Sequence, residues 1–206
     1  ELSRLLFGAD VAERGTVEVA GKRSDLGSPT GAIDSGIVLV PEERRKEGIL
    51  VKESVLHNLS LPILRQISSW GFLSGSREKG NASGVIERLG IKTPSAGQLT
   101  GYLSGGNQQK VAIGKWLNTN ADVFVFDEPT KGVDVGAKRD IFVIIGELAA
   151  QGKGILYLTC EFAEALGLAD RILVMCDGRI VKQFLRGEAT QENLLYFASA
   201  GQEEPA

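Results

Sequence analysis

The sequence predicts an α/β fold with a parallel sheet core, an inserted helical subdomain and part of an antiparallel β subdomain. In the second half of the chain, short apolar runs alternate with segments of helical periodicity, as in parallel strands joined by helices. A mostly helical stretch separates the strand-rich segments between residues 46 and 102. Residues 16–22 alternate with period two and end at a turn residue, as hairpin strands do.

The composition is that of a globular protein with enough apolar side chains for a core. The chain has 206 residues, of which 43% are hydrophobic and 24% are charged, and this size fits one domain. The formal net charge of -3 makes nucleic acid a poor default partner, because a binding face would have to be a local basic patch. No apolar run approaches the ~20 residues of a membrane span.

The two cysteines, Cys160 and Cys176, sit in apolar, strand-like stretches. Neither has metal-ligand spacing to a histidine or to another cysteine. The sequence therefore predicts two buried thiols in a reducing compartment.

The first half of the chain opens with an amphipathic segment, for which Gly8 supplies a C-cap. Pro41 stops an apolar run that fits a central strand, and a charged loop follows it. The elements predicted up to residue 100 are a helix over 1–7, a strand over 16–22, a strand within 33–40, a loop over 42–48, a helix over 53–64, a polar loop or weak helix over 66–83, a short helix over 85–90 and a loop over 93–100.

The second half alternates between strands and helices. Asp177 and Gly178 form a tight turn between the last two strands. The predicted elements are a helix over 104–117, a strand over 123–126, a helix over 135–150, a strand over 155–159, a helix over 162–167, a strand over 172–175 and a strand over 180–184. Residues 201–206 are polar and are predicted to be disordered.

Ser104, Gly105 and Gly106 open the helix predicted over 104–117. A serine can cap a helix, and glycines without side chains let a phosphate approach the backbone N–H groups. The helix N-terminus adds partial positive charge, worth about 0.3–1 kcal/mol near the surface. Taken alone, these three residues favour an ordinary capped helix over an anion site.

Asp127 and Glu128 directly follow an apolar run at 123–126. Adjacent carboxylates at the carboxyl end of a buried strand face the ligand crevice of an open α/β sheet. Asp127 is placed to help hold Mg²⁺, and Glu128 to polarise an attacking water. A strand that ends in solvent-facing acids is the simpler alternative. Asp134 is explained sufficiently as the cap of the next helix.

The combined string from Leu103 to Lys138 closely resembles the signature, Walker B and D-loop series of ABC-type ATPases. It contains Leu-Ser-Gly-Gly-Asn-Gln-Gln-Lys, then Asp-Glu-Pro-Thr, then Gly-Val-Asp-Val-Gly-Ala. This form of the motifs is similar to the C-terminal nucleotide-binding half of bacterial simple-sugar importers of the ribose, galactose and xylose type, and of related nucleoside importers. The resemblance covers nearly the whole chain. We call Ser104 to Gln108 the signature turn.

The resemblance implies a single P-loop NTPase-like ABC domain over residues 1–206. The implied sheet core covers 1–45 and 111–206, and the implied helical signature subdomain covers 46–110. Glu1 would fall just after the phosphate loop, so the Walker A segment is expected to be missing. The pattern Gly-x-x-x-x-Gly-Lys-Ser/Thr does not occur in the sequence. The isolated chain is therefore expected to bind ATP weakly and to show no turnover.

ABC domains work as head-to-tail pairs that sandwich each ATP between the phosphate loop of one domain and the signature of the other. The resemblance therefore implies ATP and Mg²⁺ as cofactors, with Glu128 as the catalytic residue and Asp127 as the metal ligand. The cofactor-binding residues that it implies are Ser104, Gly105, Gly106, Asn107, Gln108, Asp134, Glu42 and Cys160.

Two of these positions depart from the family pattern. Glu42 stands where most ABC domains have a Gln, and Cys160 stands where a His normally contacts the γ-phosphate. The chain's one histidine, His57, lies on the helix predicted over 53–64 and is interpreted as a surface or packing residue. These departures imply a site that hydrolyses ATP slowly or only binds it, although Glu128 is retained.

The implied function is to couple ATP hydrolysis to sugar import at the cytoplasmic face of the bacterial inner membrane. The implied partners are an N-terminal ABC domain of the same polypeptide, transmembrane permease subunits and, indirectly, a periplasmic sugar-binding protein. Residues 36–54 are the expected contact with the permease. Two alternatives stay open, a non-hydrolytic regulatory ABC half-domain and an importer of nucleosides rather than sugars.

Overall fold

The computed structural model describes residues 1–200 and divides into two compact units. The first unit spans Glu1–Leu156, and the second begins at Tyr157. The tail predicted to be disordered, 201–206, lies outside the described residues. Among these residues, no helix combines the length and the apolar character that crossing a membrane requires.

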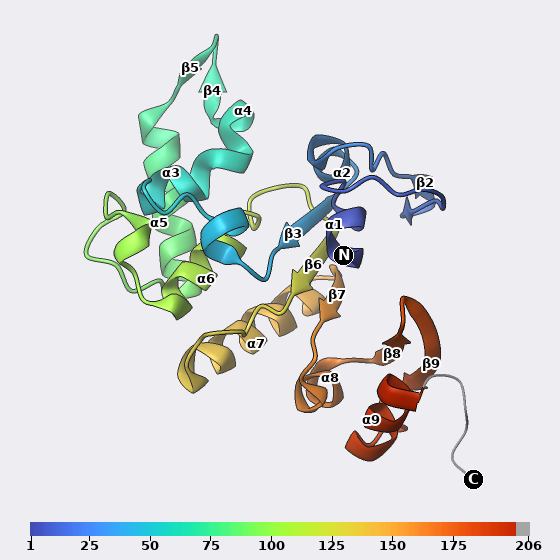
Figure 1. Ribbon diagram of the computed structural model, residues 1–206. Coiled ribbons are helices and arrows are strands. Elements are labelled where there is room, and N and C mark those ends of the chain that lie inside the picture. Colours follow the sequence, from blue (N-terminus) through green and yellow to red (C-terminus); the bar gives the residue numbers. More distant parts are fainter. Residues whose placement is uncertain (201–206) are drawn as a thin grey trace. The chain divides into compact units, whose positions relative to one another are not determined.

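A three-stranded sheet in the order β3-β6-β7 forms the centre of the first unit (Figure 1). The strands are β3 (Ile37–Val40), β6 (Val123–Asp127) and β7 (Gly154–Leu158), and the boundary between the units falls within β7. β3 and β6 run parallel, with Ile37 opposite Val123 and Val40 opposite Phe126. All four residues of β3 are buried. The parallel sheet core that the sequence predicts is therefore confirmed.

Four short elements precede β3. They are α1 (Leu2–Leu6), β1 (Glu18–Val19), β2 (Lys22–Arg23) and α2 (Pro29–Asp34). The strand predicted over 16–22 is wrong in extent, because Ala20 and Gly21 take positive φ angles of 50° and 73° and turn the chain into an antiparallel hairpin. Helix α2 takes up the first two residues of the segment 33–40, so the strand predicted within it begins only at Ile37; Ser28 caps this helix and Pro29 begins it.

Residues between β3 and β6 form mostly helices, and α3, α5 and α6 pack against one another (Figure 1). The elements are η1 (Arg44–Gly48, a π-helix), α3 (Val55–Ser60), η2 (Leu61–Ile63), α4 (Leu64–Ile67), β4 (Ser68–Ser69), β5 (Phe72–Leu73), α5 (Gly75–Leu89), η3 (Thr100–Tyr102) and α6 (Gly105–Gly114). Of the loop or weak helix left open for 66–83, the helix is found in part, since this segment holds a hairpin and most of α5. The charged loop predicted over 42–48 is wrong, since most of it forms η1.

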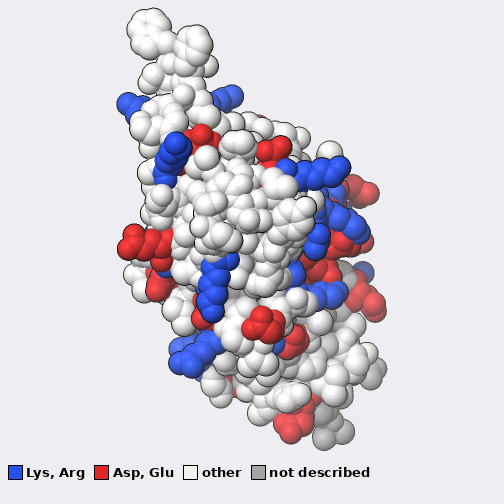
Figure 2. Space-filling view, turned by 90° about the vertical axis from the view of Figure 1, so that its left-hand side faces the viewer, with Lys and Arg blue, Asp and Glu red and all other residues white. Residues whose placement is uncertain are grey.

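The β4–β5 hairpin forms the projecting tip at the top of Figure 2. This tip is white in the figure, so it carries no charged side chains. Trp70 is 99% exposed and Phe72 is 79% exposed. Gly71, with a φ of 83°, and Trp70, with a φ of 54°, form the turn. The hairpin therefore contributes no aromatic side chain to the core.

The last helix of the first unit is α7 (Val135–Ala150). The second unit consists of two helices and an antiparallel hairpin. These elements are α8 (Phe162–Leu168), β8 (Arg171–Cys176), β9 (Arg179–Leu185) and α9 (Gln191–Ala200). Val174, Phe184, Leu194 and Phe197 form the core of this unit. The prediction of two buried thiols is wrong, because Cys160 is exposed and Cys176 is half-buried. Cys176 is the last residue of β8, where burial is incomplete.

Candidate functional site

Ser104 ends a loop and caps α6, as its residue type predicts. Its Oγ accepts hydrogen bonds from the Asn107 amide Nδ2 at 2.8 Å and, more weakly, from the Asn107 backbone N at 3.5 Å. The Oδ1 of Asn107 accepts from the backbone N of Lys92 at 2.7 Å, which fixes the orientation of the amide. Because these bonds use only the lone pairs of the hydroxyl oxygen, the O–H proton of Ser104 stays free to be donated.

The two glycines of the signature turn lie against other parts of the same unit. A Cβ on Gly105 would lie 2.8 Å from the Nη2 of Arg44 and 3.2 Å from the carbonyl oxygen of Gly132. A Cβ on Gly106 would overlap the Cβ of Ala137, in the first turn of α7. Packing therefore requires glycine at position 106, and at position 105 a larger residue would displace the guanidinium of Arg44.

Gln108 supports the signature turn from the interior. Its side chain is 2% exposed, and its Nε2 donates to the carbonyl oxygens of three residues in the loop before α6. These are Thr100 at 3.3 Å, Gly101 at 3.2 Å and Leu103 at 3.0 Å. A ligand contact for Gln108 stays a prediction, whereas its role in holding the loop is visible.

A hollow of about 290 Å³ lies beside the signature turn and the start of α7. Four of the residues predicted to bind the cofactor line it, namely Ser104, Gly106, Asn107 and Asp134. Asp134 caps α7 by accepting from the backbone N of Ala137 at 2.9 Å. Lys110 also lines the hollow and pairs with Asp140 at 2.8 Å. Serine and aspartate motifs that stand 30 positions apart in the sequence thus meet at one place.

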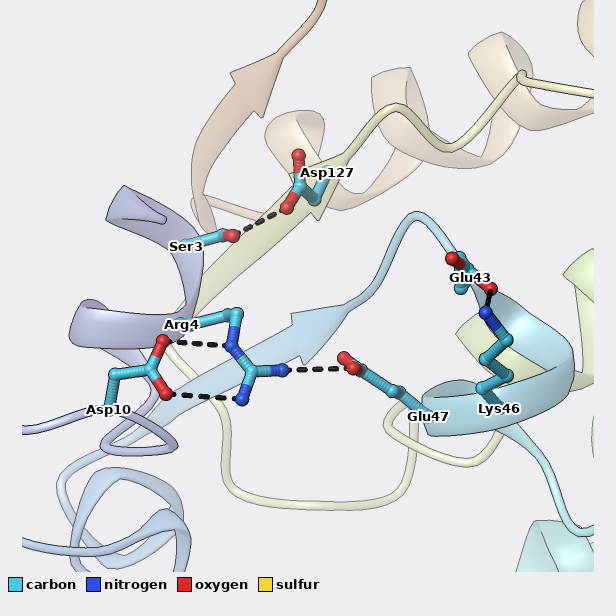
Figure 3. Close-up of polar contacts among 7 residues, drawn as sticks. All are labelled: Ser3, Arg4, Asp10, Glu43, Lys46, Glu47 and Asp127. Carbon is cyan, nitrogen blue, oxygen red and sulfur yellow. Dashed lines mark hydrogen bonds and ion pairs between the residues drawn. The ribbon is translucent and has the colours of Figure 1, made fainter.

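Asp127 closes β6, and Ser3 of α1 donates its hydroxyl proton to the Oδ2 of Asp127 at 2.5 Å (Figure 3). Ser3 is fully buried, so this bond fixes the carboxylate. Carboxylate and hydroxyl oxygens are hard donors of the kind that Mg²⁺ prefers, and Mg²⁺ is commonly held by one or two carboxylates beside phosphate oxygens and water. The residues present therefore fit this ion, and Asp127 would hold it.

Glu128 follows Asp127 in a left-handed conformation, with a φ of 45°. This region is sparsely populated by residues other than glycine, asparagine and aspartate, and outliers of this kind cluster at functional sites. Glu128 is half-buried. The strain turns the chain abruptly after β6, and it sets Glu128 apart from an ordinary solvent-facing acid.

Glu42 lies after β3 and forms an ion pair with Lys131, in the loop after β6. Figure 3 shows the neighbouring contacts of this segment. Arg4 binds both oxygens of Asp10, at 2.8 and 3.1 Å, and pairs with Glu47 at 2.9 Å. The hydrogen bond from Arg4 lowers the pKa of Asp10.

Cys160 follows β7 in the second unit, so its surroundings are described within that unit. The carboxylate of Glu164 is buried and accepts from the hydroxyls of Tyr157 at 2.6 Å and Thr159 at 3.0 Å. These bonds hold the residue before Cys160. His57 is exposed and lies 2.9 Å from Glu53, which confirms its interpretation as a surface residue.

Sequence reasoning missed Ser3 and Arg44, which contact predicted site segments from distant parts of the chain. One feature of the sequence could have indicated Ser3: it is a small polar residue within an amphipathic helix. Arg44 had none, because its partners are backbone carbonyl groups nearly 90 positions away.

The family model described as "ABC transporter" matches residues 1–131. Among curated relatives, the arabinose import ATP-binding protein AraG of Chromohalobacter salexigens is 46% identical over 96% of this chain and 40% of its own length. The xylose import ATP-binding protein XylG of Geobacillus kaustophilus is 41% identical over 98% of this chain and 40% of its own length. The chain thus spans about two fifths of the length of the curated relatives it matches.

A solved nucleotide-free ATP-binding cassette from an ABC transporter has the same fold, with a TM-score of 0.78 and 27% identity over 94% of this chain and 78% of that one. The family match covers more than half of the chain and includes the β6 carboxylates and the signature turn. These findings agree with the geometry of the site, and the chain belongs to the ABC transporter family.

Proposed function

We propose that this chain is the ATP-hydrolysing domain of a sugar importer and lends its signature turn to an ATP site shared with a second ABC domain. The observation that carries the proposal is the hydroxyl of Ser104, whose proton stays available at the N-terminus of α6. Helix N-termini attract anions, and a hydroxyl donor placed there suits a phosphate oxygen. The relatives that share the motifs are import ATP-binding proteins.

The residues of the site have separable roles. Ser104 donates to a γ-phosphate oxygen of ATP held by the opposite domain, and Asn107 keeps its hydroxyl oriented for that contact. Asp134, at the rim of the same hollow, reaches toward the opposite domain. Glu128 accepts a proton from the attacking water, and Asp127 binds Mg²⁺. When bound, Mg²⁺ would neutralise charge on the phosphate oxygens.

The partners that fit this role are an N-terminal ABC domain of the same polypeptide and the permease subunits of an importer. A periplasmic sugar-binding protein would deliver the solute to the permease. We place the domain at the cytoplasmic face of the bacterial inner membrane, with residues 36–54 facing the permease. The names of the relatives, which include arabinose, xylose, ribose and galactose, favour a sugar over a nucleoside as the solute.

Loss of the Ser104 hydroxyl tests the proposal in the full-length parent protein. We expect Ser104→Ala to lower ATP turnover at least tenfold, because it removes a donor to the phosphate. Ser28→Ala is the matched control, since Ser28 also caps a helix, accepting from the backbone N of Gly31 at 3.1 Å. Each change removes one cap, worth about 0.5–2 kcal/mol of stability. Equal turnover in the two variants would refute the proposal.

The rival function is a regulatory half-domain that supplies its signature turn without hydrolysing ATP itself. Glu128→Gln in the full-length protein separates the two, because the amide cannot accept the proton. A fall in turnover supports hydrolysis at this domain's own site. Unchanged turnover, with Ser104→Ala still impaired, assigns the regulatory role.

A further inference from the structure

The segment after β3, residues 42–48, is bound to three neighbouring elements of the first unit. Glu47 pairs with Arg4 of α1 at 2.9 Å (Figure 3). Glu42 pairs with Lys131 in the loop after β6. The carbonyl oxygen of Gly48 accepts a hydrogen bond from Lys115 at 2.6 Å. The segment is thus held on several sides, and Arg44 lies at its centre.

Arg44 connects this segment to the loop that separates β6 from α7. Its Nη1 donates to the carbonyl oxygen of Lys131 at 3.1 Å, and its Nη2 lies 3.4 Å from that of Gly132. The same Nη2 lies against Gly105, since a Cβ on that glycine would approach it to 2.8 Å. One rigid, planar guanidinium therefore touches both the loop before Asp134 and the signature turn.

The position of Arg44 is costly for a cation, which argues that the contacts hold it there. Its Nε is buried and has no hydrogen-bond partner within residues 1–200. Burial lowers the pKa of the guanidinium, and the charge of Arg45 lowers it further. An arginine without a packing role on the surface would keep its guanidinium, including Nε, in contact with water.

We propose that Arg44 is a positioning residue for the signature turn, fixing the distance between Gly105 and the Lys131–Gly132 loop. The inference rests on the proposed function, because the turn it positions is the one that meets ATP. Its consequence is that residues 42–48, the signature turn and Asp134 move as one body.

Hydrogen exchange in the nucleotide-free, full-length protein tests the positioning itself. We expect Arg44→Ala to raise amide exchange at least tenfold in residues 103–107 and 131–134, with little change in β3 or β6. Arg45→Ala is the matched control, because Arg45 is the exposed neighbouring arginine. Arg44→Lys keeps the positive charge but lacks the two Nη groups that reach Lys131 and Gly132, so it should show an intermediate effect. Equal exchange in the Arg44 and Arg45 variants would overturn the proposal.

A double-mutant cycle on ATP turnover gives a second readout that lost stability alone would not move. We expect Gly105→Ala to lower kcat/KM, because the new methyl displaces the guanidinium. In an Arg44→Ala background, Gly105→Ala should lower kcat/KM by a factor about ten times smaller, because the guanidinium that its methyl would displace is absent. Additive losses would overturn the proposal. If only the proposed function fails, Ser104→Ala leaves turnover intact while the exchange result stands.

Discussion

Lys115 gives the folded state a dependence on pH that can be worked out from its surroundings. Its ammonium donates to the carbonyl oxygen of Gly48 at 2.6 Å and lies 4.7 Å from the centre of the Trp116 ring. Burial lowers its pKa from the ordinary value of 10.5 to about 8. Below pH 8 the lysine is charged in both states, and the folded state carries the full desolvation penalty, about 3 kcal/mol.

The sign follows from proton counts. Between about pH 8 and 10.5 the unfolded chain holds the proton that the folded chain has lost, so the free energy of unfolding rises with pH. Integrated from about pH 7.5 to 9.5, the gain is about 2 kcal/mol. This is an upper value, because Lys115 keeps partial contact with water.

Urea unfolding at several pH values, for the wild type and Lys115→Met, isolates this group. The variant removes the titration, so the wild-type free energy should rise relative to it by about 2 kcal/mol across this range. Lys52→Met, at an exposed lysine, should keep the wild-type slope. Parallel curves for the wild type and Lys115→Met would refute the reasoning.

Two further predictions concern packing and buried polar groups. Gly106→Ala should lower the free energy of unfolding by about 1–3 kcal/mol, because its methyl would overlap Ala137. Adding Ala137→Gly should restore most of this loss, and an unchanged urea midpoint in the single variant would contradict the prediction. Asn58 is 1% exposed and forms hydrogen bonds with backbone atoms of Leu50 and with the hydroxyl of Thr100. Asn58→Ala should therefore lower the free energy of unfolding by about 1–3 kcal/mol, measured by thermal unfolding. A melting-temperature shift no larger than that of Asn120→Ala, at an exposed asparagine, would contradict this prediction.

Strongly periodic elements were predictable from the sequence because their local signals agree with their packing. Helix Val135–Ala150 was predicted with its observed bounds, since Asp134 caps it and Ile141, Ile144 and Leu148 form its buried face. Strand Val123–Asp127 was predicted to within one residue, because its three central side chains are buried. In both cases local preference and tertiary burial favour the same structure.

Helix α5 was predicted only in part, because much of its composition opposes a helix. Gly75, Gly80 and Gly84 each lower helix propensity by roughly 1 kcal/mol relative to Ala. A Cβ on any of them would meet nothing within 4 Å. The side opposite Gly80 and Gly84 buries Ala82, Val85 and Leu89. Packing of that face stabilises a helix that its sequence alone would not.

The site was predictable where its residues form local motifs and not where they meet across the chain. Ser104, Asn107 and Asp134 were named from such motifs, and they line one hollow. The bond from Ser3 to Asp127 joins residues 124 positions apart and leaves no sequence pattern. Single polar contacts over such distances depend on the assembled fold, and periodicity does not report them.

The glycines of the signature turn show how a correct motif can rest on an incomplete reason. Their small size was first interpreted as room for a phosphate at the backbone. In the structure a Cβ on Gly105 would meet the guanidinium of Arg44 and the carbonyl of Gly132, and a Cβ on Gly106 would overlap Ala137. Packing within the unit therefore excludes a larger residue at Gly106, whereas at Gly105 a larger residue would first have to displace the end of the Arg44 side chain. The small size of these glycines is thus explained in part by packing, and the exposed hydroxyl of Ser104 is the donor of the turn that faces solvent.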